Sequence, residues 1–175
     1  MGNLISQNRI DMKKIFLLLA FAGMIISCDQ HSPDDPADKD KVRFAEAMFF
    51  EACGKNTVPN VEGENKNMPF EMDSVRAEAQ ILTDTTLDLR LYGITFSSKM
   101  PVTIDLVIPD VRYTRTEDQI TLFGENISPK MGGMPFDRYK INVLQGSITA
   151  DSLTFSNNYG TYHDCTYAGK VTKML

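Results

Sequence analysis

Residue types that commonly build functional sites are scarce in this chain. Its 175 residues include two histidines, three cysteines and no tryptophan. The histidines, His31 and His163, do not stand at the spacing of a tetrahedral metal site or of a Ser–His–Asp triad. No glycine-rich loop joins a strand-like run to a helix, so nucleotide binding is unsupported. We therefore expect a protein that is not an enzyme and that holds no metal or cofactor.

Long hydrophobic runs are also missing. The apolar segment near the N-terminus, residues 15–26, is twelve residues long, whereas a membrane-spanning helix needs about 20 apolar residues. Two lysines precede this segment and a small residue follows it, which is the anatomy of a secretory signal peptide. We predict a signal peptide over residues 1–27, with Met12 as an alternative translation start.

The end of the signal peptide, Ile25-Ile26-Ser27-Cys28, resembles the lipobox of bacterial lipoproteins. This resemblance implies that Cys28 becomes the N-terminus, carries palmitate and other acyl chains, and anchors the protein to the bacterial outer membrane. The protein would face the periplasm or the cell surface. Residues 28–41 are acidic, contain two prolines and have almost no apolar side chain, so we predict a flexible tether. The acidic residues fit a surface-export signal and a plain linker equally well.

Two other interpretations of the N-terminus remain open. Residues 15–26 could stay uncleaved as an anchor, and residues 1–6 fit an N-myristoylation pattern. The position of Cys28 disfavours the first, and the complete export signal that follows disfavours the second.

The charge of the chain limits its partners. The full chain has a net charge of −5 and residues 1–27 carry +2, so residues 28–175 carry −7. Such a surface repels phosphate backbones, and we predict no nucleic-acid partner. The partners we expect are a membrane through the lipid anchor and a small apolar ligand, or a protein or glycan.

From residue 42 onward, apolar and polar residues alternate with a period of two. Val75, Ala77, Ala79 and Ile81, for example, alternate with polar residues. This pattern is typical of antiparallel strands with one face on a core. Residues 43–50 could instead form a short helical turn. The predicted strands are 43–52, 71–82, 86–94, 102–109, 119–125, 138–146, 147–156 and 161–172.

A sheet of about eight strands must bury its apolar face, either in a sandwich or in a closed barrel. Short hairpins between consecutive strands favour an all-β, antiparallel up-and-down β-barrel over residues 42–175. The interior of such a barrel is filled by side chains or holds one small ligand. Small residues such as Ala77 and Ala79 favour a hollow interior, whereas Leu87, Leu89 and Leu91 favour a filled one.

An internal repeat supports the hairpin plan. Met68-Pro69, Met100-Pro101 and Met134-Pro135 recur at spacings of 32 and 34, each before a strand-like run. Proline belongs at the start of a strand because it cannot donate to the ladder.

Several segments together resemble the calycin-like (lipocalin-like) β-barrel family of bacterial lipoproteins. The resemblance implies a lipocalin-like barrel and a small apolar ligand, and it assigns no functional residue. The glycine–x–tryptophan signature of true lipocalins is absent, since the chain has no tryptophan. The resemblance covers residues 45–171 and is carried by residues 108–111, 131–136, 145–155 and 166–170.

Two cysteines other than Cys28 are candidates for a disulfide. An exported protein can form disulfides, and the first and last strands of an up-and-down barrel are neighbours. We predict that Cys53 and Cys165 pair, provided that the strand register allows it. The alternative for Cys165 is a metal or thiolate–imidazole pair with His163, which would share its strand face.

The leading hypothesis is a cell-envelope lipoprotein with a non-catalytic barrel that binds a small lipophilic ligand. The alternative is an interaction module with a filled barrel, which binds a protein or glycan or inhibits an enzyme through its loops. Tyr159 and Tyr162 are then the predicted contact residues. A hydrolase is the least favoured class, because paired carboxylates such as Glu117 and Asp118 fall in loop-like segments.

Overall fold

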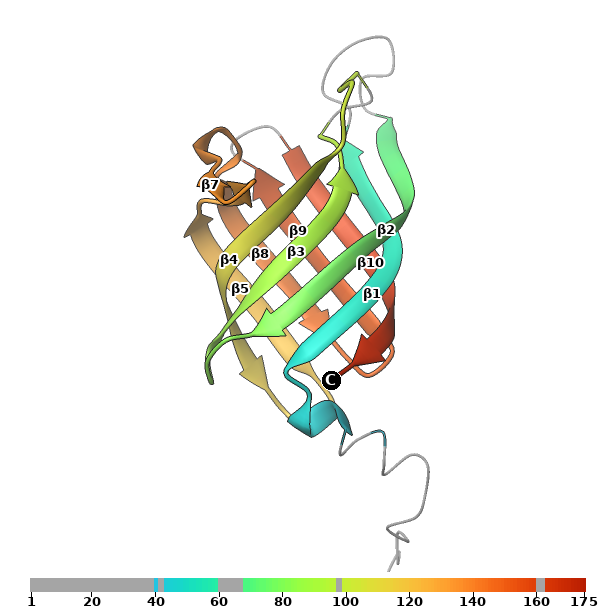
Figure 1. Cartoon of the computed structure of the whole chain (residues 1–175), viewed down its shortest axis with the longest axis vertical. Helices are drawn as coiled ribbons and strands as arrows, with labels where there is room; N and C mark the ends of the chain where they lie inside the picture. Colours follow the sequence, from blue (N-terminus) through green and yellow to red (C-terminus); the bar gives the residue numbers. More distant parts are fainter. Residues whose placement is uncertain (1–39, 41–42, 60–67, 97–98, 160–162) are drawn as a thin grey trace, which may run out of the picture. The chain divides into compact units, whose positions relative to one another are not determined.

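The computed structural model of the chain describes residues 40, 43–59, 68–96, 99–159 and 163–175. The signal peptide, Cys28 and nearly all of the predicted tether lie outside these residues. The described part is built from eight long strands (Figure 1). They are β1 (Phe49–Pro59), β2 (Pro69–Ile81), β3 (Thr86–Ile94), β4 (Ile104–Arg115), β5 (Ile120–Ile127), β8 (Ile141–Ile148), β9 (Ser152–Tyr159) and β10 (His163–Met174).

The strands form a closed antiparallel barrel. Each long strand pairs with the next one along the chain, and β10 pairs with β1 to complete the ring. The prediction of an eight-stranded up-and-down barrel is therefore confirmed. A small hairpin, β6 (Lys130–Met131) and β7 (Met134–Pro135), and the 3₁₀ helix η1 (Asp137–Tyr139) stand between β5 and β8, with β6 paired to β4.

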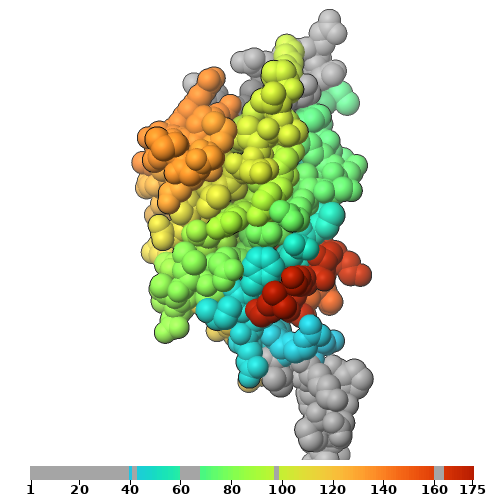
Figure 2. All heavy atoms as spheres, in the orientation of Figure 1, coloured from blue at the N-terminus to red at the C-terminus, as the bar shows by residue number. Residues whose placement is uncertain are grey.

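Pairing between the first and last strands is what closes the ring. Phe50 lies opposite Met174, and the backbone N–H groups of Met48 and Phe49 donate to the Leu175 carbonyl at 2.7 and 3.0 Å. Figure 2 shows the C-terminal residues, in red, against the cyan surface of β1. The barrel therefore has no free edge at either of these strands.

One end of the barrel, which we call the capped end, is made of three equivalent tight turns. Thr83, Thr116 and Thr149 each stand at the start of a turn, 33 residues apart. In each turn the threonine Oγ1 accepts a hydrogen bond from the backbone N–H three residues later, at 3.0, 3.2 and 3.1 Å. The spacing agrees with that of the Met-Pro segments, so the barrel contains three repeats of one hairpin plan.

The N-terminal residues of the described domain close the capped end. Residues 43–46 are helical, and this turn places Phe44 and Ala47 against the core, with exposed fractions of 1% and 2%. Arg115 donates hydrogen bonds to the carbonyls of Ala45 and Ala47 at 3.1 and 2.6 Å. The prediction of a strand over 43–52 was therefore wrong in its first half, and the alternative of a helical turn is confirmed.

The fourth predicted strand, 102–109, is also too short, since β4 continues to Arg115. Pro109 does not end the strand because a bulge accommodates it. Asp110 has a positive φ of 55°, and its N–H donates to Asp88 Oδ1 at 3.1 Å instead of to the ladder. After the bulge, alternate side chains of β4 again face the interior, and Val111 and Tyr113 are both buried.

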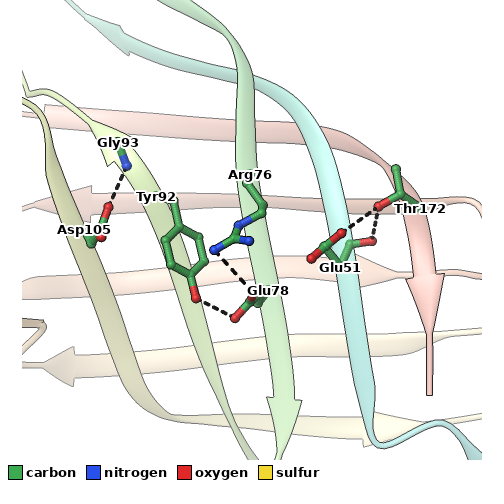
Figure 3. Close-up of polar contacts among 7 residues, drawn as sticks. All are labelled: Glu51, Arg76, Glu78, Tyr92, Gly93, Asp105 and Thr172. Carbon is green, nitrogen blue, oxygen red and sulfur yellow. Dashed lines mark hydrogen bonds and ion pairs between the residues drawn. The ribbon is translucent and has the colours of Figure 1, made fainter.

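Mainly apolar side chains line the inside of the barrel and polar side chains cover the outside. Leu87, Leu89 and Leu91 are at most 1% exposed. On the outer face, Arg76 lies over the Tyr92 ring at 3.8 Å, and the Tyr92 hydroxyl donates to Glu78 at 2.6 Å (Figure 3). A barrel whose outer face contacts lipid has the opposite arrangement, with an outward apolar band.

A buried tyrosine of β10 reaches over β1 to β2, past two glycines. The Tyr167 hydroxyl donates to the Val75 carbonyl at 3.1 Å, beside the bulge of β2 where Ser74 has a φ of 60°. Gly54 and Gly169 lie opposite each other beneath this contact. A Cβ atom on Gly54 would lie 2.1 Å from the Ala168 carbonyl oxygen and 2.2 Å from the Gly169 Cα. Gly54 therefore lets β1 approach β10, and Gly169 leaves room for the Tyr167 side chain, which a Cβ at that position would meet.

We predict that Gly54→Ala destabilises the domain by about 3 kcal/mol or more, because the new methyl group meets backbone atoms that cannot move independently. Gly93→Ala is the matched control. A Cβ there meets nothing within 4 Å, so only the positive φ opposes it, at a cost of about 1 kcal/mol. Urea unfolding measures both variants, and equal losses would contradict the close approach of β1 and β10.

Candidate functional site in the barrel interior

Buried polar side chains gather at the end of the barrel opposite the capped end, which we call the loop end. Among the described residues, the buried polar side chains are those of Asn56, Thr95 and Asn157, and none of them is charged. Asn56 lies near the end of β1, Asn157 near the end of β9, and Thr95 directly after β3. The interior is therefore apolar near the capped end and partly polar near the loop end.

Asn157 and Tyr159 are adjacent inward-facing residues of β9. Asn157 lies opposite Cys165 of β10, and the side chains of Asn157, Tyr159 and Cys165 are buried, with exposed fractions of 4%, 2% and 2%. Neither the Asn157 Nδ2 nor the Tyr159 hydroxyl has a hydrogen-bond partner in the described structure. Most buried polar atoms in folded proteins have a partner, so two unpaired atoms side by side call for an explanation.

The groups of this cluster remain uncharged at neutral pH. Burial raises the pKa of Tyr159 well above its usual value, and the nearby Cys165 thiol adds to this rise. The Asn157 amide lies close enough to lower the pKa of Tyr159 in part, yet no hydrogen bond of ordinary geometry joins the two. Burial, with a contribution from Asp164, raises the pKa of Cys165 to about 12.

Aromatic rings cover this cluster at the loop end. Phe96, which follows β3, stacks on Tyr139 of η1 at 4.0 Å between ring centroids and meets Tyr159 edge-on at 4.8 Å. Phe136 packs against Tyr139 at 4.8 Å. Phe96 is 3% exposed. The rings of Phe96, Phe136 and Tyr139 come from connecting segments, which are in general more mobile than the strands of a barrel wall.

Thr95 and Met72 complete the described lining. The N–H and hydroxyl of Thr95 point to the Met72 sulfur, at 3.3 and 3.5 Å. Sulfur is a weak acceptor, so Thr95 is only loosely bound. The cluster as a whole can offer hydrogen bonds from neutral donors and contacts to apolar surface. Its described residues include no nucleophile activated by a base.

The predicted disulfide between Cys53 and Cys165 is wrong. Both cysteines are free, Cys53 on the outer face and Cys165 inside the barrel. Cys53 lies opposite Lys170 in the β1–β10 register, five positions from Cys165. The two strands are neighbours, as predicted, but the register and the facing of the side chains keep the two thiols apart.

The structure separates the other residues that the sequence analysis singled out. Tyr159 was predicted to be an exposed contact residue and is instead buried, whereas Tyr162 lies outside the described residues. The His163 side chain is also outside the description, and Asp164 faces outward, where Asn158 donates to it at 2.6 Å. Glu117 and Asp118 are exposed in a turn.

No group of three or more histidine, cysteine or acidic side chains in the described residues is placed to hold a metal ion. No described helix is long and apolar enough to cross a membrane.

The sequence analysis missed Asn56 and Asn157. The predicted strand 147–156 stops before Asn157, since asparagine and glycine favour turns, whereas the structure continues β9 through Asn157 to Tyr159. One signal was available: Leu153, Phe155, Asn157 and Tyr159 keep a period of two, so asparagine occupies an inward position. A polar residue at a core position is informative because it needs a partner.

Comparisons with known proteins give a fold likeness but no family. No family model and no curated protein matches the chain, so the resemblance to calycin-like proteins stays a prediction. A solved structure from Bacteroides fragilis, provisionally named an outer membrane protein, aligns with 17% identity and a TM-score of 0.46. The alignment covers 77% of this chain and 52% of that chain, about half of its length. At this similarity it carries no functional argument.

We predict that the two barrel cysteines differ sharply in reactivity. With Cys28→Ser, a maleimide at pH 8 should label Cys53 at once and Cys165 at least about a hundredfold more slowly, because the buried thiol reacts only after opening. Cys53→Ala should remove the fast phase. Mass spectrometry counts the labels. A folded protein in which neither thiol reacts would contradict this prediction and indicate a disulfide between Cys53 and Cys165.

Proposed function

We propose that this chain is a lipid-anchored cell-envelope protein whose barrel binds a small lipophilic molecule without catalysing a reaction. The observation that carries the proposal is the pair of unpartnered polar atoms, Asn157 Nδ2 and Tyr159 Oη, buried at the loop end of the interior. A bound molecule with an apolar body and one polar group would satisfy both. The aromatic cover at the loop end gives such a molecule a route that leaves the strands paired.

The envelope location rests on the predicted signal peptide and on the lipobox at Cys28. Two features of the described domain agree with it. Its outer face carries ion pairs, such as that between Lys55 and Glu71 at 2.6 Å, which suit water rather than lipid. The helical turn that precedes β1 lies at the capped end (Figure 1). The ligand site at the loop end is therefore at the opposite end of the barrel from the turn that leads into β1.

A second candidate function is an interaction module that binds a protein or glycan through the loop end. Large apolar side chains are exposed there, and exposed apolar surface often marks a binding site. Met68 is 62% exposed, Val102 60% and Met134 71%. These residues belong to the repeated Met-Pro segments, or directly follow one, as Val102 does. The leucine-rich core near the capped end favours a filled interior, and a filled interior is compatible with this second function.

A matched pair of phenylalanines tests the ligand-binding proposal. The neutral apolar probe N-phenyl-1-naphthylamine becomes fluorescent when it enters an apolar site, and we expect it to bind the intact domain. Phe96→Ala, at the loop end, should weaken binding about tenfold, because an aromatic ring that packs on a ligand contributes about 1 kcal/mol or slightly more. Phe44→Ala removes an equally buried ring at the capped end and should change binding less than about twofold.

Thermal unfolding monitored by circular dichroism checks that both variants are folded. No probe binding to the wild type would contradict the ligand-binding proposal and favour the interaction module. Equal effects of the two variants would place binding away from the loop end.

A further inference from the structure

The hydrogen-bonding groups of the interior determine which kind of polar atom on a ligand can bind there. Asn157 Nδ2 is a donor, and the Tyr159 hydroxyl can donate or accept. The neighbouring Cys165 thiol is a weak donor. The buried cluster therefore offers two or three donors that converge near the β9–β10 pair. The complementary group is an oxygen acceptor, such as a carbonyl or hydroxyl oxygen.

Among the described side chains, none in this interior offers a partner for an anion. No lysine, arginine, histidine or acidic side chain is among the buried residues that the structure describes. Arg115 is inward only at the capped end, where its two terminal nitrogens donate to the carbonyls of Ala45 and Ala47 and its buried Nε has no hydrogen-bond partner. Arg138, which lies 5.8 Å from the Tyr139 ring, is exposed outside the aromatic cover. A carboxylate placed at Tyr159 would lose its hydration without gaining a counter-charge from any side chain that the structure describes.

We propose that Asn157 and Tyr159 form a subsite for an uncharged oxygen acceptor, and that the barrel selects lipophilic esters, ketones or alcohols over carboxylates. This inference rests on the proposed function, since it names the ligand class of the same site. The apolar body of the ligand would occupy the interior beside Asn157, and its acceptor oxygen would face the amide and the hydroxyl.

Two ligands that differ only in charge test this selectivity. Methyl dodecanoate and dodecanoate share one chain, and at pH 8 only the second is charged. Each is titrated against N-phenyl-1-naphthylamine bound to the mature chain with Cys28→Ser. We expect the ester to displace the probe with an affinity at least about tenfold higher than that of the carboxylate, because only the carboxylate needs a counter-charge. Arg138→Gln should leave both affinities unchanged.

Substitutions on one strand test the two side chains. Tyr159→Phe and Asn157→Leu should each weaken ester binding about fivefold to tenfold, which corresponds to one neutral hydrogen bond. Their binding of the probe itself, which has no oxygen acceptor, should stay within about twofold. Asn158→Leu is the matched control. Asn158 is on the same strand but faces outward, toward Asp164, so ester binding should not change.

The outcomes separate this inference from the proposed function. Dodecanoate that binds as tightly as the ester, or an ester affinity unchanged in Tyr159→Phe and Asn157→Leu, would overturn the subsite while ligand binding stands. Tight dodecanoate binding that disappears in Arg138→Gln would also overturn it and place the polar group at the barrel mouth. A wild type that binds neither the probe nor the ester would overturn the subsite and the proposed function together.

Discussion

Closure of the barrel through β10 and β1 is the constraint on which the other features depend. The first and last strands, β1 and β10, pair without a turn between them, and this pairing completes the ring. The other long strands form three repeats of one hairpin plan. Closure fixes which residues face inward, since alternate side chains of a strand point to opposite sides of the sheet. It also requires the close approach at Gly54 and Gly169, above which Tyr167 reaches Val75.

Closure leaves the barrel with two different ends. Threonine turns and the helical segment around Phe44 seal the capped end, where Arg115 binds the carbonyls of Ala45 and Ala47. At the loop end, the aromatic rings of Phe96, Phe136 and Tyr139 cover the interior. The interior follows the same division, because Asn157 and Tyr159 stand near the loop end and the leucine core near the capped end. The proposed site for an amphipathic molecule lies where the buried polar atoms and the aromatic rings meet.

Much of the fold could be predicted from the sequence because alternation is a local signal. Strand number, order and closure follow from period-two runs such as Val75 to Ile81, and the repeat was visible in the Met-Pro segments. Register was not predictable, because bulges at Ser74, Asp110 and Thr172 shift the pairing. Cys53 and Cys165 do not pair because they lie five positions apart in the β1–β10 register and face opposite sides of the barrel wall. The site was missed because the composition around Asn157 is that of a turn, while its inward position depends on β9 extending to Tyr159.

The central claim is that the barrel holds a lipophilic molecule at the loop end. Native mass spectrometry of the protein purified gently from its own cells tests this claim most directly. The account predicts an added mass that is released on unfolding and belongs to an uncharged, lipophilic compound. A protein that shows only its own mass, and still does so after incubation with total lipid extract, would contradict the claim and leave a filled barrel that acts through its surface.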